Sequence, residues 1–343
     1  VLLLVSLSVS FILAESMVRV YGLQSNFSFI DAVKQMKSRT YGAYLSRSEK
    51  KVNGYNELKP NFQINSITSD YQVVYETNQL GFRDDPFNEE EEYFLALGDS
   101  LTFGEGVMKH NTYVDKIEKG LGINLLNLGA PGHSIGQVWN SLKHNSPLIP
   151  KIKGCILFYV KPLFWRNWIG RDENIKQTQK KVSTIKLKDS SQMTKEFSLD
   201  YVSEAFAYVR YLLMLKEVKK DLLQADKERW KNPASEYMEK GRQYQDTSDP
   251  EKIEHNRYFI SKISQKCKEL SGKQLIVINL DYANQYPFFK SMQNLEYVSI
   301  YPELKEYAKN KQVTFKYDLH YNPAMHAEIS KHAVKKLQEK IKK

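Results

Sequence analysis

The stretch that decides the fold reads Tyr93-Phe94-Leu95-Ala96-Leu97-Gly98-Asp99-Ser100-Leu101-Thr102-Phe103-Gly104. It opens with an apolar run that stands between the acidic run Glu89 to Glu92 and Gly98, a pattern typical of a short buried strand. Such a strand delivers Asp99 and Ser100 to its carboxyl end, where open α/β sheets place their binding sites. A serine at that position is a candidate nucleophile. The Gly-x-Ser-x-Gly elbow is absent, because Thr102 stands where its second glycine would be.

A second chemical cluster lies near the carboxyl terminus, in the run Tyr317-Asp318-Leu319-His320-Tyr321-Asn322-Pro323. Serine is a weak nucleophile at neutral pH, so it needs an imidazole to take its proton and a carboxylate to orient that imidazole. Asp318 and His320 supply both groups. Asn322 and Pro323 resemble a helix cap followed by proline at the first helical position, so the histidine is predicted to precede the last helix.

Together these residues resemble the SGNH (GDSL) hydrolase superfamily. Gly98 to Leu101 is similar to its first block, and Asp318 to Asn322 to the Asp-x-His-x-Asn form of its fifth block in some membrane-anchored bacterial members. The hexapeptide Asn78 to Arg83 is similar to a lead-in found upstream of the serine in such proteins. Taken without the serine block, the alternative interpretation of this hexapeptide is a glycine turn with a solvated arginine. The resemblance implies that Ser100 is the nucleophile, His320 the general base and then acid, and Asp318 the orienting carboxylate. It implies no metal or organic cofactor.

The oxyanion donors are less complete in the sequence. The spacing from Asn127 to Gly132 matches the second block, so the resemblance implies that backbone N–H groups of Ser100 and Gly132 hold the oxyanion. The third block would supply an asparagine amide, but this chain has Lys161-Pro162 there. Losing one such donor typically costs ~10²–10³ in rate. Lys161, or Asn167 reaching back, is a candidate substitute.

Three other residues are interpreted by position alone. Asp99 is a candidate for contact with the substrate or oxyanion, because it precedes the nucleophile. His326 is interpreted as a packing residue of the last helix, and His133 as part of the turn before the helix that starts near residue 135, because histidine is intermediate in burial.

Strands alternate with helical segments beyond residue 86, and this predicts an α/β domain with a doubly wound parallel sheet. The predicted strands cover residues 93–97, 121–128, 155–160 and 274–280. The resemblance makes the fold SGNH-type, or flavodoxin-like. Residues 170–265 are rich in Lys, Glu and Gln and are interpreted as a helical insertion within a domain of residues 86–343. Residues 21–85 are predicted to be an extended lead-in, and residues 282–307 an aromatic loop.

The first residues form an apolar run from Val1 to Ala14. Fourteen residues fall short of the ~20 that a membrane span needs, but the chain lacks an initiator methionine, so we expect a truncated start. Residues 1–20 are predicted to be a transmembrane or signal-anchor helix, with a cleaved signal peptide as the competing interpretation. The resulting expectation is a membrane-anchored, extracytoplasmic protein, either periplasmic or on the cell surface.

The composition sets further bounds. The 343 residues carry 50 Lys and Arg against 40 Asp and Glu, a net charge of +10. Lysine along amphipathic helices is usually a solvated face, and no nucleic-acid motif accompanies it. Two cysteines, Cys155 and Cys267, are too few for a disulfide framework or a cysteine-based zinc site. Cys155 lies in an apolar run and is predicted to be a small buried thiol.

Three classes of function remain. The leading one is a serine ester hydrolase, a carbohydrate or acyl esterase or an O-acyltransferase, that forms an acyl-enzyme on an acyl ester or acylated glycan. The alternative is a catalytically weakened protein of the same fold that binds polysaccharide or a partner, motivated by the missing asparagine. A nucleic-acid or anionic-surface binder rests on charge alone, and we expect no nucleic-acid partner.

Overall fold

The structure is a computed structural model that describes residues 2–25, 29–30, 57–169, 203–231, 246–318 and 320–341. The chain divides into two compact units. The larger unit comprises Leu45–Gln63, Tyr75–Ser183 and Pro233–Lys343. The smaller comprises Val1–Tyr44, Ile64–Val74 and Thr184–Asn232.

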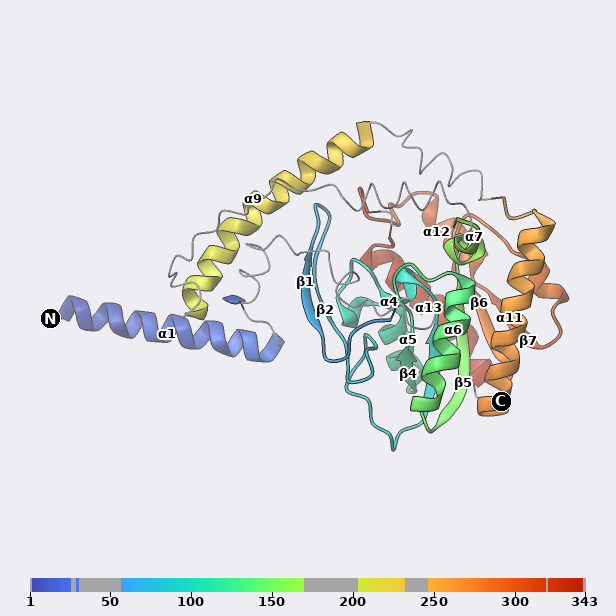
Figure 1. Cartoon of the computed structure of the whole chain (residues 1–343). Coiled ribbons are helices and arrows are strands. Elements are labelled where there is room, and N and C mark those ends of the chain that lie inside the picture. The colour runs from blue at the N-terminus through green and yellow to red at the C-terminus, as the bar shows by residue number, and fades with distance from the viewer. Residues whose placement is uncertain are drawn as a thin grey trace. The chain divides into compact units, whose positions relative to one another are not determined.

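The larger unit is built on a five-stranded parallel sheet (Figure 1). Its strands are β3 (Tyr93–Leu97), β4 (Asn124–Asn127), β5 (Ile152–Tyr159), β6 (Leu275–Asn279) and β7 (Leu295–Ser299). The spatial order is β4-β3-β5-β6-β7, so the first strand in sequence lies second in the sheet. This is the flavodoxin-like order of doubly wound folds, and the predicted α/β class is confirmed. The order reverses between β3 and β5, so the carboxyl ends of these two strands form the topological switch point.

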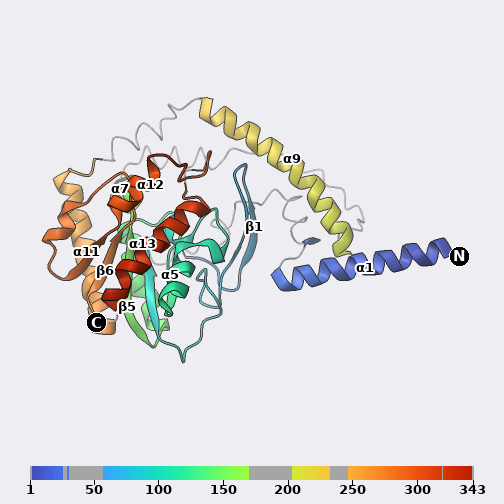
Figure 2. The same cartoon turned by 180° about the vertical axis from the view of Figure 1, so that it is seen from behind.

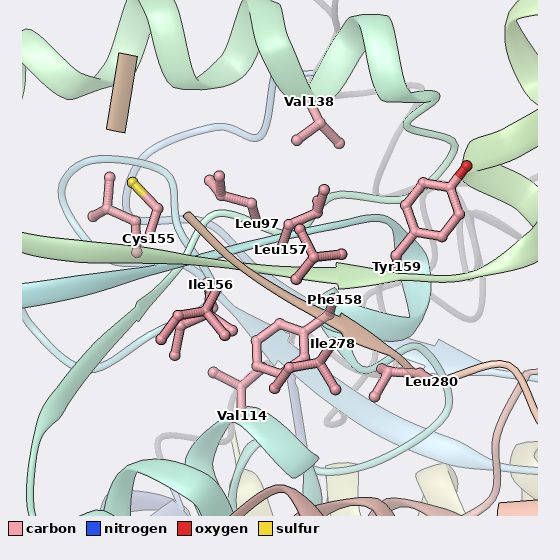
Figure 3. Close-up of a cluster of buried hydrophobic side chains, with 14 of the residues drawn as sticks. Leu97, Val114, Val138, Cys155, Ile156, Leu157, Phe158, Tyr159, Ile278 and Leu280 are labelled. Atoms are coloured by element: carbon pink, nitrogen blue, oxygen red, sulfur yellow. The ribbon is translucent and has the colours of Figure 1, made fainter. Parts of the chain in front are cut away.

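Helices cover both faces of the sheet. On one face α5 (Tyr113–Leu121) packs against α13 (Pro323–Ile341), and on the other α6 (Ile135–Asn145) packs against α11 (Pro250–Ser271). In Figure 1 α6 and α11 lie in front of the sheet, and in Figure 2, which is seen from behind, α5 and α13 lie in front of it. In Figure 3 Val138 of α6 faces Leu157, whereas Val114 of α5 lies on the opposite side with Phe158. Both faces of β5 are therefore buried, as its nearly continuous apolar sequence requires.

Shorter elements complete the larger unit. They are α4 (Ser100–Phe103), η1 (Lys109–Asn111), η2 (Ser146–Leu148), α7 (Lys161–Ile169), η4 (Pro287–Ser291) and α12 (Tyr301–Ala308). Three of the elements, η4, β7 and α12, fall in residues 282–307, which were predicted to be a loop. That prediction was wrong because β7 is a short edge strand with only two buried residues, so its apolar signal is weak.

The two cysteines are paired, and the prediction of a buried free thiol was wrong. A disulfide joins Cys155 of β5 to Cys267 of α11, 112 residues apart in sequence. Both side chains are buried, and their Cα atoms are 5.9 Å apart. The pairing follows from the fold, because α11 packs directly on β5. The number of cysteines could not reveal this pairing, because it depends on where α11 packs. Most of α11, which begins at Pro250, falls in the segment predicted to be the insertion.

The smaller unit pairs α1 (Leu2–Ser25) with α9 (Glu204–Lys231). A two-stranded sheet is formed by β1 (Gln63–Ile67) and β2 (Gln72–Glu76). Glu15 of α1 accepts hydrogen bonds from Ser203 Oγ at 2.6 Å and Ala205 N at 3.0 Å, at the start of α9. Phe29 and Tyr211 pack within the same unit.

The predicted transmembrane anchor is not supported. The helix itself is present, but among the described residues none of the helices combines the length and the apolarity that crossing a bilayer demands. Within α1, Glu15 and Arg19 form an ion pair at 2.7 Å.

Candidate active site

Ser100 is the first residue of α4, directly after β3. Asp99 caps this short helix, because its Oδ1 accepts a hydrogen bond from Leu101 N at 3.0 Å. Gly98 is required for the close approach of α4 to the strand, since a Cβ there would lie 1.8 Å from Thr102 Oγ1. The turn therefore holds Ser100 rigidly at the switch point of the sheet.

His320 and Asp318 reach Ser100 from the segment before α13. His320 Nε2 lies 2.8 Å from Ser100 Oγ, within hydrogen-bond distance. Asp318 Oδ1 accepts a short hydrogen bond from His320 Nδ1 and a second one from His320 N at 3.2 Å. The carboxylate thus fixes the ring, and when the ring is neutral it favours the tautomer with the proton on Nδ1 and the lone pair on Nε2. The structure brings together the three residues predicted to form the triad.

A second carboxylate, which the sequence analysis missed, adjoins the same ring. Oε2 of Glu105 lies 3.2 Å from His320 Nε2, on the glycine-flanked loop that follows α4. Burial lowers the pKa of His320, but the charges of Glu105, Asp318 and Asp99 and the hydrogen bond to Asp318 outweigh burial and raise it to about 9. The sequence signal was Gly104-Glu105-Gly106, a polar loop directly after the nucleophile.

The same three side chains form the one group of potential metal ligands among the described residues. Glu105, Asp318 and His320 each offer a ligand atom, all within 4.8 Å of one another. However, Asp318 and the Nδ1 of His320 already bond to each other, and Nε2 faces a serine hydroxyl. This donor set fits proton transfer better than it fits a cation.

Arg166 of α7 is a further residue that the sequence analysis missed. Its Nη1 donates to Asp99 Oδ2 at 3.0 Å and to the carbonyl oxygen of His133 at 3.0 Å. Asp99 is fully buried, and both of its carboxylate oxygens accept hydrogen bonds, so its side chain holds the loop rather than reaching for substrate. Arg166 thereby links the residue before Ser100 to the residue after Gly132.

Arg83, from the lead-in hexapeptide, is buried rather than solvated. It donates from Nη1 to the carbonyls of Phe103 and Gly104 at 2.9 and 2.6 Å, and from Nη2 to that of Val107 at 2.6 Å. These carbonyls belong to the end of α4 and the following loop, which carries Glu105. Through Arg83, the lead-in therefore fixes the backbone of the loop that follows the nucleophile.

Asn127 is the last residue of β4, and Gly132 lies in the turn that follows this strand. Asn127 Nδ2 donates to the carbonyl of Thr102 at 2.9 Å, tying this turn to α4. Gly132 has a φ of 78°, in the left-handed region that favours glycine. Lys161 begins α7 at the carboxyl end of β5 and is half-buried. The side chain of Asn167 lies outside the described residues, and the oxyanion roles of Gly132 and Lys161 stay predictions.

The two other histidines interpreted from the sequence, His326 and His133, are buried. His326 Nδ1 accepts a hydrogen bond from Tyr113 N at 3.0 Å, and its ring stacks on that of Tyr113. Burial lowers the pKa of His326 to about 3, aided by the nearby positive charges of Arg83, His320 and Lys116, so the ring is neutral at pH 7. His133 lies in the turn before α6, where its carbonyl meets Arg166.

Comparison with known proteins finds no matching family model and no matching curated protein. Solved structures similar to the chain include a member of the lipolytic protein G-D-S-L family from Veillonella parvula DSM 2008 (12% identity, 71% of this chain and 97% of that one, TM-score 0.37). Others are the lipase/acylhydrolase from Enterococcus faecalis (10%, 73% and 96%, 0.35) and an alpha/beta hydrolase enzyme from the metagenome of Lake Arreo, Spain (11%, 73% and 95%, 0.34). Activity and substrate depend on the side chains at the site rather than on such likenesses.

Proposed function

We propose that this protein is a serine ester hydrolase of the SGNH type. The observation that carries the proposal is the contact of His320 Nε2 with Ser100 Oγ at 2.8 Å, with Asp318 on the opposite ring nitrogen. Nucleophile, base and orienting carboxylate come from segments far apart in sequence and meet at the switch point of the sheet. This is the geometry by which a serine hydroxyl is activated.

The reaction begins with transfer of the Ser100 hydroxyl proton to His320 Nε2 as Oγ attacks the ester carbonyl. The resulting imidazolium is stabilised by Asp318, and backbone N–H groups of Ser100 and Gly132 receive the oxyanion. Collapse of the tetrahedral intermediate breaks the bond to the leaving alcohol, which takes the proton from Nε2. The acyl group then remains on Ser100 Oγ.

The substrate class is an acyl ester or an acylated glycan. We place the reaction outside the cytoplasm, at the cell surface or in the periplasm. The Cys155–Cys267 disulfide supports this placement, because disulfides persist in oxidising compartments.

The test is mass spectrometry of the full chain after treatment with a fluorophosphonate, comparing wild type with Ser100→Ala and His320→Ala. We expect one covalent adduct on Ser100 in the wild type, none in Ser100→Ala, and labelling reduced by at least about a hundredfold in His320→Ala. Circular dichroism confirms that each variant is folded. A folded wild-type protein that forms no adduct contradicts the proposal and favours the alternative, a binding protein of the same fold.

A further inference from the structure

Glu105 has no part in the reaction as written so far, although it lies beside the base. Its Oε2 is 3.2 Å from His320 Nε2, on the same side of the ring as Ser100 Oγ. The side chain is 17% exposed, so this carboxylate lies mostly out of bulk solvent. A serine triad requires one carboxylate, and Asp318 already occupies the Nδ1 side.

The position next to Nε2 is occupied twice during the catalytic cycle. The leaving alcohol takes a proton there in the first half, and the molecule that releases the acyl group gives up a proton there in the second. Glu105 is a carboxylate that only accepts hydrogen bonds when ionised. The Glu105 carboxylate therefore favours, at the position next to His320 Nε2, a molecule with two protons. Such a molecule can give one proton to Nε2 and still donate a hydrogen bond to Glu105.

Water and an alcohol differ in this respect. Water has two protons, so it can donate one to His320 Nε2 and the other to Glu105. A simple alcohol has one hydroxyl proton, which goes to Nε2 and leaves the carboxylate facing an oxygen lone pair. A charged acceptor that loses a donor in a partly buried site loses a hydrogen bond of the stronger kind.

We propose that Glu105 orients the deacylating water and makes this enzyme a hydrolase rather than an acyltransferase to simple alcohols. The proposal rests on the proposed function. In the step, the water oxygen bonds to the acyl carbon while one water proton moves to Nε2. The bond from the acyl carbon to Ser100 Oγ then breaks, and Oγ takes the proton from Nε2. Glu105 holds the second water proton by a hydrogen bond and neither gains nor loses one.

The experiment follows the acyl-enzyme with p-nitrophenyl acetate as substrate and methanol as competing acceptor. Wild type is compared with Glu105→Ala and Glu105→Gln, and with Glu90→Ala as a matched control, because Glu90 is an exposed carboxylate paired with Lys151. The readouts are the p-nitrophenol burst, the steady-state rate and the mass of the quenched protein. The ratio of methyl acetate to acetate is measured as well. All are recorded across the pH profile, which separates deacylation from a change in His320 ionisation.

In Glu105→Ala we expect the burst to persist while deacylation slows by about tenfold to a hundredfold, so that acetyl-Ser100 accumulates. The ratio of transfer to hydrolysis should rise about tenfold, since water loses its second acceptor and methanol loses nothing. Glu105→Gln keeps an acceptor oxygen and nearly the same volume, so it should fall between wild type and Glu105→Ala. Glu90→Ala should match wild type.

Equal slowing of burst and steady state in both folded Glu105 variants, with an unchanged ratio of products, overturns the inference. In that outcome the wild type still labels with the fluorophosphonate, so the proposed function stands. A wild type that neither labels nor shows a burst contradicts the proposed function itself. The two failures are therefore distinguishable in the same set of measurements.

Discussion

At the scale of single residues, the charge state of His320 governs when the base is available. The ring must be neutral at Nε2 to accept the serine proton, and its pKa is raised to about 9 because Glu105, Asp318 and Asp99 outweigh the effect of burial. The proton is lost only as the pH rises through that value. We therefore expect kcat/KM for a short-chain ester to increase with pH and to reach its midpoint near 9.

The same proton affects stability with the opposite sign. A histidine whose pKa is higher in the folded state stabilises the fold fully below its unfolded value of 6.5, and this contribution disappears as the pH rises through about 9. Activity should therefore rise over the window in which this contribution to the free energy of unfolding declines. Initial rates and urea unfolding curves over that window check both trends. A kcat/KM midpoint close to 6.5 would contradict the assignment of the raised pKa.

The triad could be predicted from sequence because each member lies in a short local pattern with its own chemistry. Ser100 follows a buried strand, and Asp318 and His320 precede a capped helix. Glu105 and Arg166 could not be predicted in the same way. Their roles depend on which side chains they contact across the fold. Glu105 contacts His320, which is 215 residues away in sequence, and Arg166 contacts Asp99, which is 67 residues away.

At the scale of elements, Arg166 links the two turns that carry the proposed oxyanion donors. Replacement by alanine removes the bond to Asp99, before Ser100, and the bond to the His133 carbonyl, after Gly132. It also leaves the buried Asp99 carboxylate without its ion pair. Because small misplacements of catalytic groups are costly, we expect Arg166→Ala to lower kcat by on the order of a hundredfold with little change in KM.

Steady-state kinetics with a p-nitrophenyl ester test this expectation, and unfolding curves confirm that the variant is folded. Arg166→Lys keeps the positive charge but cannot reproduce the geometry of a guanidinium, so it should recover part of kcat. If a folded Arg166→Ala variant raised KM alone, Arg166 would be a substrate-binding residue instead of a positioning residue.

Elements were predictable where the apolar pattern is strong. The central strands β3, β5 and β6 are buried on both faces, and their apolar runs identify them directly. The edge strand β7 buries only Leu295 and Val298 and carries Glu296, so its sequence does not show the apolar run of a central strand. Arg83 illustrates a different limit, because a motif can mark a residue without telling whether its side chain points to solvent or to the backbone of a loop.

At the scale of the whole molecule, the alternation of strands and helices predicted a doubly wound parallel sheet, but it did not predict which distant segments pack together. The smaller unit brings α1 together with α9, which lie at opposite sides of the nucleophile in sequence. In the larger unit α11 crosses the predicted end of the insertion and packs on β5. Such contacts depend on chain topology rather than on local propensity, so composition alone could not reveal them.

The disulfide between β5 and α11 allows the packing of these two elements to be tested through its effect on stability. Cys155 and Cys267 close a loop with a sequence separation of 112, and the chain-entropy model gives a loop of this size about 4–5 kcal/mol of stabilisation through the unfolded state. Both sulfurs are buried, so a reductant reaches them on unfolding rather than in the native protein. We expect urea midpoints in the presence of dithiothreitol to fall well below those without it.

The control is the Cys155→Ala/Cys267→Ala double variant, in which dithiothreitol should leave the urea midpoint unchanged because no bond remains to be reduced. Comparing the wild type with itself, reduced and oxidised, avoids the cost of the cavities that the two substitutions create. Thiol titration in denaturant without reductant supplies the covalent evidence, since a paired chain has no reactive thiol. If two thiols titrate and dithiothreitol does not change the wild-type urea midpoint, the cysteines are free. The disulfide then no longer supports an oxidising compartment.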